Sequence, residues 1–212
     1  MDAIRIVTQI EELDKKRCKI YINQEFAFVL YKGEITQYKL KPEESIEDNV
    51  YFEITNIVIP KRAKKRCLNL LQKRPYTEYK LREKLKEGLY AQNIIEEAIE
   101  YVKMFHYIDD YDYACQYIFY HKESEPRKKM EDKLALKGID KEVLNKAFSE
   151  FYDEEEQGEV ELKQAKVFLE KKKYDIKNAD WKEKQKIYAF LVRKGINSSI
   201  IKKVMSIQED TI

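Results

Sequence analysis

The sequence is poor in residues that break helices and in residues that bind metals. Its 212 residues include five glycines, four prolines, three cysteines and two histidines. Scarce glycine and proline favour long helices. The cysteines are odd in number and form no CxxC pair, so neither a zinc ribbon nor a disulfide framework is expected. They are interpreted as small buried residues of a protein in a reducing compartment.

Membrane and enzyme signatures are also missing from the sequence. No apolar run approaches the roughly 20 residues of a membrane helix, and the N-terminus lacks the apolar core of a signal peptide. We therefore expect a cytoplasmic protein with no membrane partner. No Walker-type loop, GxSxG or GxGxxG motif occurs. The sequence predicts a protein that is not an enzyme and that uses no cofactor.

Charge is abundant but nearly balanced. The 41 basic and 39 acidic residues leave a net charge of +2, so the overall charge says little about partners. The acidic run at 152–162 lacks the Asp/Asn/Gly order of a calcium-binding loop. It is interpreted as a solvated connector.

The first 60 residues differ from the rest of the chain. Apolar and polar residues alternate over 17–33 around Asn23-Gln24, which predicts a β-hairpin with a two-residue turn. Residues 50–60 are ambiguous, because their β-branched and aromatic residues favour a strand but their spacing also fits one face of a helix. Pro60 would end this segment or stand in the first turn of the next helix.

From residue 61 onward, apolar residues recur at helical spacing and predict a repeated unit. Three pairs of aliphatic residues lie nine positions apart with a glycine between them: Leu85 and Ile94 around Gly88, Leu134 and Val143 around Gly138, Leu191 and Ile200 around Gly195. Glycine just past a helix suits a left-handed C-cap. Gly88 lies one place earlier than its counterparts, so its turn is expected to differ.

Each pair is preceded by a further helical segment, at about 61–73, 110–121 and 158–173. The predicted fold is therefore mainly α: three tandem three-helix repeats that form an elongated curved body, with a small N-terminal β-hairpin extension. The predicted segments are 1–60 for the extension and 61–109, 110–157 and 158–212 for the repeats. Within the first repeat, one helical stripe is predicted to contain Ile95, Ala98, Ile99, Val102 and Phe105.

The stretch HYIDDYDYA at 106–114 is compatible with half a metal site, a catalytic carboxylate pair or a helix start. Neither histidine of the chain lies at a metal-binding spacing, so the metal site lacks ligands. Asp109 or Asp110 suits the N-cap of the next helix. Tyr107 and Ile108 would then pack at the helix entry.

Three motifs, in this order, resemble the RecX family of recombinase regulators. The first contains Arg74, Thr77, Glu78, Leu81, Lys84 and Leu85. The second contains Tyr107, Ile108, Asp109, Asp110, Tyr113 and Ala114. The third contains Leu134, Lys137, Gly138 and Ile139. The resemblance covers 61–157 and extends in weaker form to the third repeat and the hairpin. It departs from the family at His106, where the family usually has glycine.

The resemblance implies a monomeric, non-enzymatic protein that binds the filament of RecA recombinase on single-stranded DNA. It would regulate DNA repair and recombination by modulating the recombinase and ATPase activity of the filament; inhibition is favoured and activation is left open. A stand-alone helical module that binds duplex DNA, with one helix in a groove, is the alternative. A protein-binding scaffold is left open as well.

Local charge supplies candidate contacts. Residues 61–86 carry eleven Lys or Arg against two acids, with tyrosines between them. Such a mixture is typical of surfaces that meet phosphates and unstacked bases, although a solvated face or a contact to acidic recombinase patches explains it equally well. The candidate filament or DNA contacts are Lys61, Arg62, Lys64, Lys65, Arg66, Arg74, Arg82, Arg127, Lys128, Lys129, Lys171, Lys172 and Lys173.

Overall fold

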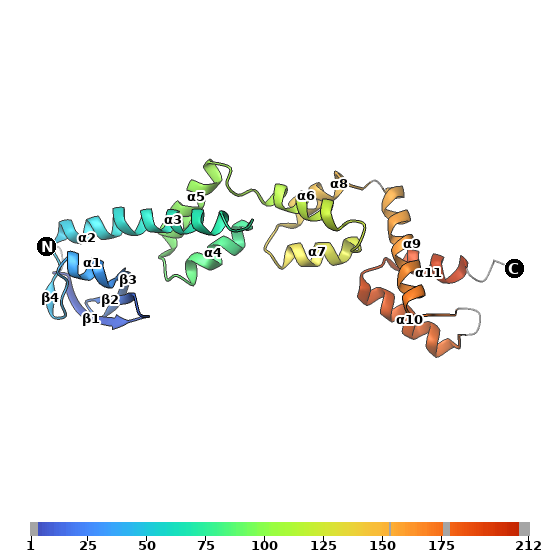
Figure 1. Cartoon of the computed structure of the whole chain (residues 1–212), viewed down its shortest axis with the longest axis horizontal. Helices are drawn as coiled ribbons and strands as arrows, with labels where there is room; N and C mark the ends of the chain where they lie inside the picture. Colours follow the sequence, from blue (N-terminus) through green and yellow to red (C-terminus); the bar gives the residue numbers. More distant parts are fainter. Residues whose placement is uncertain (1–3, 153, 176–178, 208–212) are drawn as a thin grey trace. The chain divides into compact units, whose positions relative to one another are not determined.

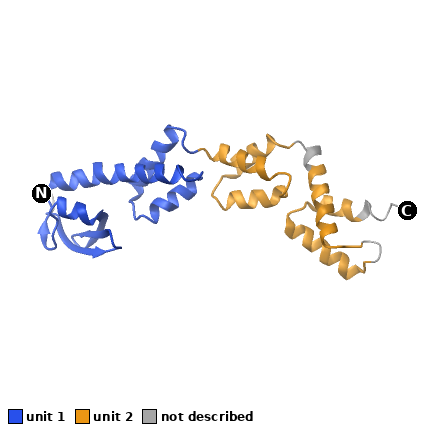
Figure 2. Ribbon diagram, in the orientation of Figure 1, with its two compact units in different colours: residues 1–108 blue, residues 109–212 orange. Residues whose placement is uncertain are grey.

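The computed structural model describes residues 4–152, 154–175 and 179–207 (Figure 1). The chain divides into two compact units, Met1–Ile108 and Asp109–Ile212 (Figure 2). Unit 1 contains a small sheet and a set of helices, whereas the described part of unit 2 is built from helices. The mainly α class with three-helix units is confirmed. The elongated body and the boundaries of the four segments stay predictions.

The N-terminal extension is an antiparallel four-stranded sheet with the order β3-β2-β1-β4, which is more than the predicted hairpin. The strands are β1 (Ile6–Glu12), β2 (Arg17–Ile22), β3 (Glu25–Tyr31) and β4 (Glu44–Ser45). The hairpin itself is confirmed: β2 and β3 pair around Asn23 (φ 50°) and Gln24 (φ 72°), as a two-residue turn with two left-handed residues requires. Asn23 also binds β1, since its Oδ1 accepts from the Ile6 N–H at 2.9 Å.

The ambiguous segment at 50–60 is helical. It belongs to a continuous helix made of α2 (Asp48–Glu53), a π-helical turn (Ile54–Val58) and α3 (Ile59–Leu71). Ile54 and Ile59 are buried in the core that this helix shares with the sheet. Burial against the sheet therefore decides the conformation over the strand propensity of the individual residues. Figure 1 shows the helix running along the sheet and the short α1 (Lys32–Gln37).

Pro60 does not interrupt this helix, because the π-helical turn precedes it. Pro60 has no N–H to donate, which would break a regular helix. In the π turn, the Ile59 N–H donates to the Ile54 carbonyl five residues earlier. Side chains satisfy other carbonyls: Thr55 Oγ1 donates to Tyr51 O at 2.8 Å and Asn56 Nδ2 donates to Phe52 O at 3.1 Å.

Unit 1 is completed by α4 (Glu78–Lys86) and α5 (Gln92–Met104). Four members of the predicted stripe on α5 are buried: Ile95, Ala98, Ile99 and Val102. The fifth, Phe105, was predicted wrongly. It lies just past the end of α5 as the C-cap residue and is 49% exposed.

Unit 2 contains two sets of three helices with separate apolar clusters. The first set is α6 (Asp110–His121), α7 (Arg127–Ala135) and α8 (Lys141–Ser149), which pack around Ile118, Leu134 and Phe148. The second set is α9 (Glu154–Lys171), α10 (Trp181–Lys194) and α11 (Ser198–Ile207), which pack around Leu169, Leu191 and Ile201. Among the described helices, none is long and apolar enough to cross a membrane.

The acidic run at 152–162 is not the solvated connector that its composition suggested. Residue 153 lies outside the described residues, but α9 begins at Glu154 and includes residues 154–162 of the run. Glu161 is buried, and its Oε2 accepts from the Asn197 N–H at 3.1 Å. A buried carboxylate with such a partner ties α9 to the start of α11.

The turns that follow α4, α7 and α10 show the predicted difference at Gly88. Gly138 and Gly195 are left-handed, with φ of 83° and 90°. In the turn after α4, Leu89 takes the left-handed position instead of Gly88, with φ of 59°. A left-handed leucine costs about 1–2 kcal/mol relative to glycine, so the shift of one position places strain in this turn.

Candidate functional site

The stretch at 106–114 contains the start of a helix. Asp109 is the N-cap of α6, and its Oδ1 accepts from the N–H groups of Tyr111 at 2.8 Å and Asp112 at 3.1 Å. Across the described chain, no group of three potential metal ligands occurs. Ile108 is buried as predicted, but Tyr107 is 53% exposed, so its predicted packing at the helix entry is wrong.

Two of the candidate lysines form the edge of an open groove on unit 1. Lys61 and Lys65 are exposed and lie four residues apart, so they share one face of α3. Neither forms an ion pair with a described residue. They line a groove of about 410 Å³ between α3 and α5, with Tyr101 on the opposite side. Arg66 is exposed on another face of α3, also without a salt bridge to the described residues.

Lys64 lies in the same groove, but its charge is partly compensated. Its Nζ lies 2.7 Å from Glu97 Oε1 and 5.3 Å from the centre of the Tyr101 ring. The groove therefore contains three lysines and one carboxylate. Its net charge is positive, and an aromatic ring lies beside the cations.

Arg62, by contrast, stabilises the fold. Its Nη1 donates to Val29 O at 2.9 Å, and its Nη2 lies 2.5 Å from Glu34 Oε1. The guanidinium also stacks over the Tyr31 ring at 4.9 Å. These contacts tie α3 to the sheet, so little of the Arg62 charge is available to a partner.

Arg82 belongs to a network of ion pairs between α4 and α5. Its Nη2 lies 2.8 Å from both Glu78 Oε1 and Glu96 Oε2, and Lys103 Nζ lies 2.6 Å from Glu78 Oε2. Burial acts to raise the pKa of Glu78, but the hydrogen bonds from Lys103 and Arg82 outweigh it and hold this pKa below its ordinary value. Arg74, the remaining candidate of unit 1, is exposed and stacks over the Tyr76 ring at 4.7 Å.

The candidates of unit 2 lie at two separate places. At the start of α7, Arg127 pairs with Glu131 at 2.7 Å, Lys128 with Asp132 at 2.8 Å, and Lys129 with Glu125 at 3.9 Å. Lys171, Lys172 and Lys173 are exposed at and after the end of α9. Lys172 lies 5.1 Å from the Phe190 ring centre. The structure thus separates the candidates into a partly paired group and an exposed group.

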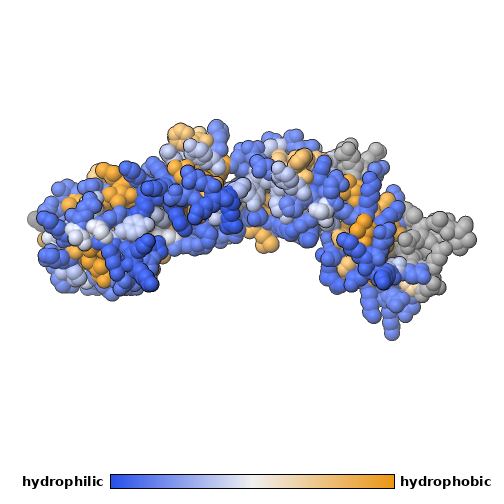
Figure 3. All heavy atoms as spheres, in the orientation of Figure 1, coloured by the Kyte–Doolittle hydropathy of each residue, from blue (hydrophilic) through white to orange (hydrophobic). Residues whose placement is uncertain are grey.

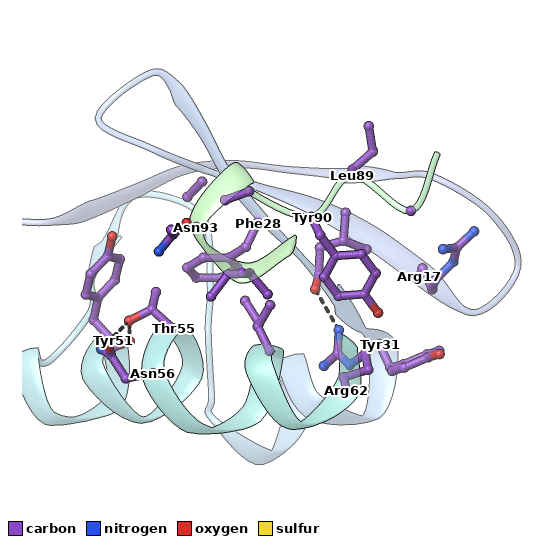
Figure 4. Close-up of a pocket in the computed structure, with 16 residues that line it drawn as sticks. Arg17, Phe28, Tyr31, Tyr51, Thr55, Asn56, Arg62, Leu89, Tyr90 and Asn93 are labelled. Carbon is purple, nitrogen blue, oxygen red and sulfur yellow. Dashed lines mark hydrogen bonds between the residues drawn. The ribbon is translucent and has the colours of Figure 1, made fainter. Parts of the chain in front are cut away.

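A pocket of about 230 Å³ lies between the sheet and the long helix of unit 1 (Figure 4). Figure 4 shows Phe28 and Tyr90 at its centre and Arg62 at its edge. Arg62 is held by Glu34, and Arg17 by Asp14 at 2.8 Å. Since both guanidiniums of the lining are engaged by neighbouring carboxylates, we interpret the pocket as the seam between sheet and helices.

The sequence pattern missed a group of exposed rings at the end of α5. Phe105 was placed on the buried stripe and Tyr107 at a packed helix entry, yet both are exposed. The signal that could have revealed them is position 106, where the family usually has glycine. His106 is left-handed, and the turn at this residue removes Phe105 from the helical face.

Family models match two parts of the chain. The description "RecX, third three-helix domain" matches residues 159–205, and "RecX, first three-helix domain" matches residues 63–101. The model of the third domain covers all of α10 and most of α9 and α11. The model of the first domain covers all of α4 and most of α3 and α5.

Curated relatives match over nearly the whole length. "Regulatory protein RecX" of Clostridium beijerinckii is 29% identical over 210 residues, which covers 95% of this chain and 96% of the relative. "Regulatory protein RecX" of Clostridioides difficile is 28% identical over 207 residues, which covers 95% of this chain and 94% of the relative.

Solved structures share the fold. "Crystal structure of regulatory protein RecX" has a TM-score of 0.63 at 22% identity and covers 96% of this chain and 100% of its own. "Crystal structure of RecX from Lactobacillus salivarius" has a TM-score of 0.59 at 23% identity and covers 72% of this chain and 96% of its own.

Proposed function

The chain belongs to the RecX family of regulatory proteins, and from this premise we propose that it binds the filament of RecA on single-stranded DNA and regulates it. Binding would modulate, with inhibition as the expected direction, the ATP hydrolysis and strand exchange of the filament. In this role the protein acts in DNA repair and recombination as a cytoplasmic monomer. It contributes a binding surface and no catalytic step.

The observation that carries the proposal is the exposed positive charge on α3. Lys61, Lys65 and Arg66 are exposed and form no salt bridge with the described residues. Cations without partners attract a phosphate backbone and accelerate its encounter, whereas paired cations contribute little field. Because Arg82 of α4 is engaged by Glu78 and Glu96, we place the contact on the α3 groove rather than on α4.

The exposed lysines after α9 support a second contact. Lys171, Lys172 and Lys173 lie at the end of a helix, where cations also complement the helix dipole. A filament is a long repetitive partner, so two weak contacts on one chain would reinforce each other.

The test measures the single-stranded-DNA-dependent ATP hydrolysis of RecA with increasing amounts of the full-length protein. We expect a dose-dependent decrease at amounts below one protein per RecA monomer. A matched titration against the naked DNA strand gives the change that DNA sequestration alone would cause. An ATPase rate that follows only this sequestration curve would contradict the proposal and favour a stand-alone DNA-binding module.

A further inference from the structure

Three aromatic rings form a row at the C-terminal end of α5. The ring centres of Tyr101 and Phe105 are 4.9 Å apart, and those of Phe105 and Tyr107 are 6.0 Å apart with nearly parallel planes at 28°. Phe105 and Tyr107 are each about half exposed. Figure 3 shows an apolar patch on the surface at this end of α5. Large rings exposed together are a feature of interaction sites rather than of ordinary surface.

The backbone holds this row in place. The His106 N–H donates to Lys103 O at 2.9 Å and the Tyr107 N–H donates to Val102 O at 2.8 Å. His106 is left-handed with φ of 54°. Together these features form a Schellman motif, which closes the helix and turns the chain back on it. The rings of Phe105 and Tyr107 are therefore positioned by a hydrogen-bonded turn.

The row continues into the basic groove of α3. Tyr101, the first ring of the row, also lines the groove that contains Lys61 and Lys65. Lys64 Nζ lies 5.3 Å from the centre of the same ring. Exposed rings and exposed cations thus lie side by side on unit 1, and Tyr101 belongs to both.

We infer that these residues form a stacking surface for single-stranded DNA, with bases on Phe105 and Tyr107 and phosphates at Lys61 and Lys65. Proteins that bind single strands combine a positive groove with aromatic side chains on which successive bases stack. In duplex DNA the base faces are already stacked on one another, so the rings select unpaired strands. The inference deepens the proposed function and rests on it, because it names the DNA strand as the element contacted by unit 1.

The experiment compares two oligonucleotides of equal length, homothymidine and its abasic counterpart, by fluorescence anisotropy with the full-length protein. We expect the wild type to prefer homothymidine. The double variant Phe105→Ala/Tyr107→Ala should bind homothymidine roughly tenfold more weakly and the abasic strand unchanged, because only the base contact is lost.

Tyr79→Ala is the matched control. Tyr79 is another exposed ring of unit 1 with a lysine over it, Lys80 at 5.0 Å, but this lysine is paired with Glu83 at 2.8 Å. We expect Tyr79→Ala to bind both oligonucleotides as the wild type does. The circular dichroism of each variant shows that the fold is retained.

The inference is overturned if the wild type does not prefer homothymidine, or if the double variant keeps that preference. It is also overturned if the double variant binds both strands normally but no longer inhibits RecA, since the rings would then contact protein.

The ATPase assay keeps the two proposals distinct. A wild type that inhibits RecA without a base preference removes the stacking surface and leaves the proposed function standing. A base preference lost only in the double variant, without any effect of the wild type on RecA, supports the surface and removes the proposed function.

Discussion

Helices α3 and α4 are both rich in lysine and arginine, but their charges have different partners. On α4, Lys80 pairs with Glu83 at 2.8 Å, Lys84 with Glu87 at 2.6 Å, and Arg82 with two glutamates. On α3, Lys61 and Lys65 form no salt bridge with any described residue. The segment from Ile59 to Leu71 contains no acid, whereas α4 has acids three or four residues from its cations.

This difference separates charge that stabilises the fold from charge that reaches a partner. Pairs three or four residues apart on a helix attract each other and reduce the field beyond them. Cations without such a partner keep their field and their hydration until a phosphate replaces the water. A count of basic residues along 61–86 therefore overstates the charge that a filament would meet.

The largest expected effect comes from removing the groove lysines. We predict that Lys61→Ala/Lys65→Ala weakens binding to single-stranded DNA roughly tenfold at low salt. The slope of the logarithm of the binding constant against the logarithm of the salt concentration should become shallower by about 1.4, since each lost phosphate contact contributes about 0.7. The α4 double variant Lys80→Ala/Lys84→Ala removes the same charge and should leave the slope unchanged. Anisotropy titrations at several salt concentrations measure both. Equal slopes for the two double variants would show that net charge alone matters, and the comparison would fail.

The next effect is on stability and concerns α4. Arg82 is about a quarter exposed and bridges Glu78 of its own helix to Glu96 of α5. We predict that Arg82→Met lowers the free energy of opening α4 and α5 by about 1 kcal/mol, because a network of ion pairs is lost. Hydrogen exchange of the α4 and α5 amides measures this locally, which suits a chain with two compact units.

Lys61→Met is the control for this change, since it removes one cation from α3 that has no salt bridge in the described chain. Its amide protection in α3 and α5 should equal that of the wild type. DNA binding should respond in the opposite way: Lys61→Met weakens it and Arg82→Met does not. A loss of DNA binding in Arg82→Met with unchanged protection would place Arg82 at the contact and contradict the division between the helices.

The repeats and their turns could be predicted from the sequence because their signals are local. A stripe at helical spacing, a glycine after the helix and an aspartate at its start each act within about five residues. Asp109 is therefore an N-cap as predicted, and the shift of Gly88 by one place appears as a left-handed Leu89.

The sheet and the pairing of charges depend on residues far apart in the sequence. Strand β4 has two residues and pairs with β1, so little in its own composition indicates a strand. The glutamates that engage Arg62, Lys64 and Arg82 lie 28, 33 and 14 residues away. Part of the pairing is local, since Glu78 lies four residues before Arg82 and Glu131 lies four residues after Arg127. Phe105 was misplaced because helical spacing continues past the residue at which α5 ends.

The smallest expected effect is the pH dependence of the α4 network, which centres on Glu78. The hydrogen bonds from Lys103 and Arg82 overcome the effect of burial and hold the pKa of Glu78 below its ordinary value of 4.5. A carboxylate whose pKa is lowered by folding stabilises the native state above its unfolded pKa. That stabilisation is lost as the pH falls through the folded pKa. Protection of the α4 and α5 amides should therefore decrease below about pH 4.5.

The variant Glu78→Gln isolates this contribution, since glutamine has a similar shape and no charge. We predict that it opens α4 and α5 more readily than the wild type at pH 7, and that the difference shrinks as the pH is lowered. A difference between Glu78→Gln and wild type that stays constant with pH would mean that the Glu78 charge does not stabilise α4. The stabilisation that α4 gains from Arg82 would then come from its pair with Glu96.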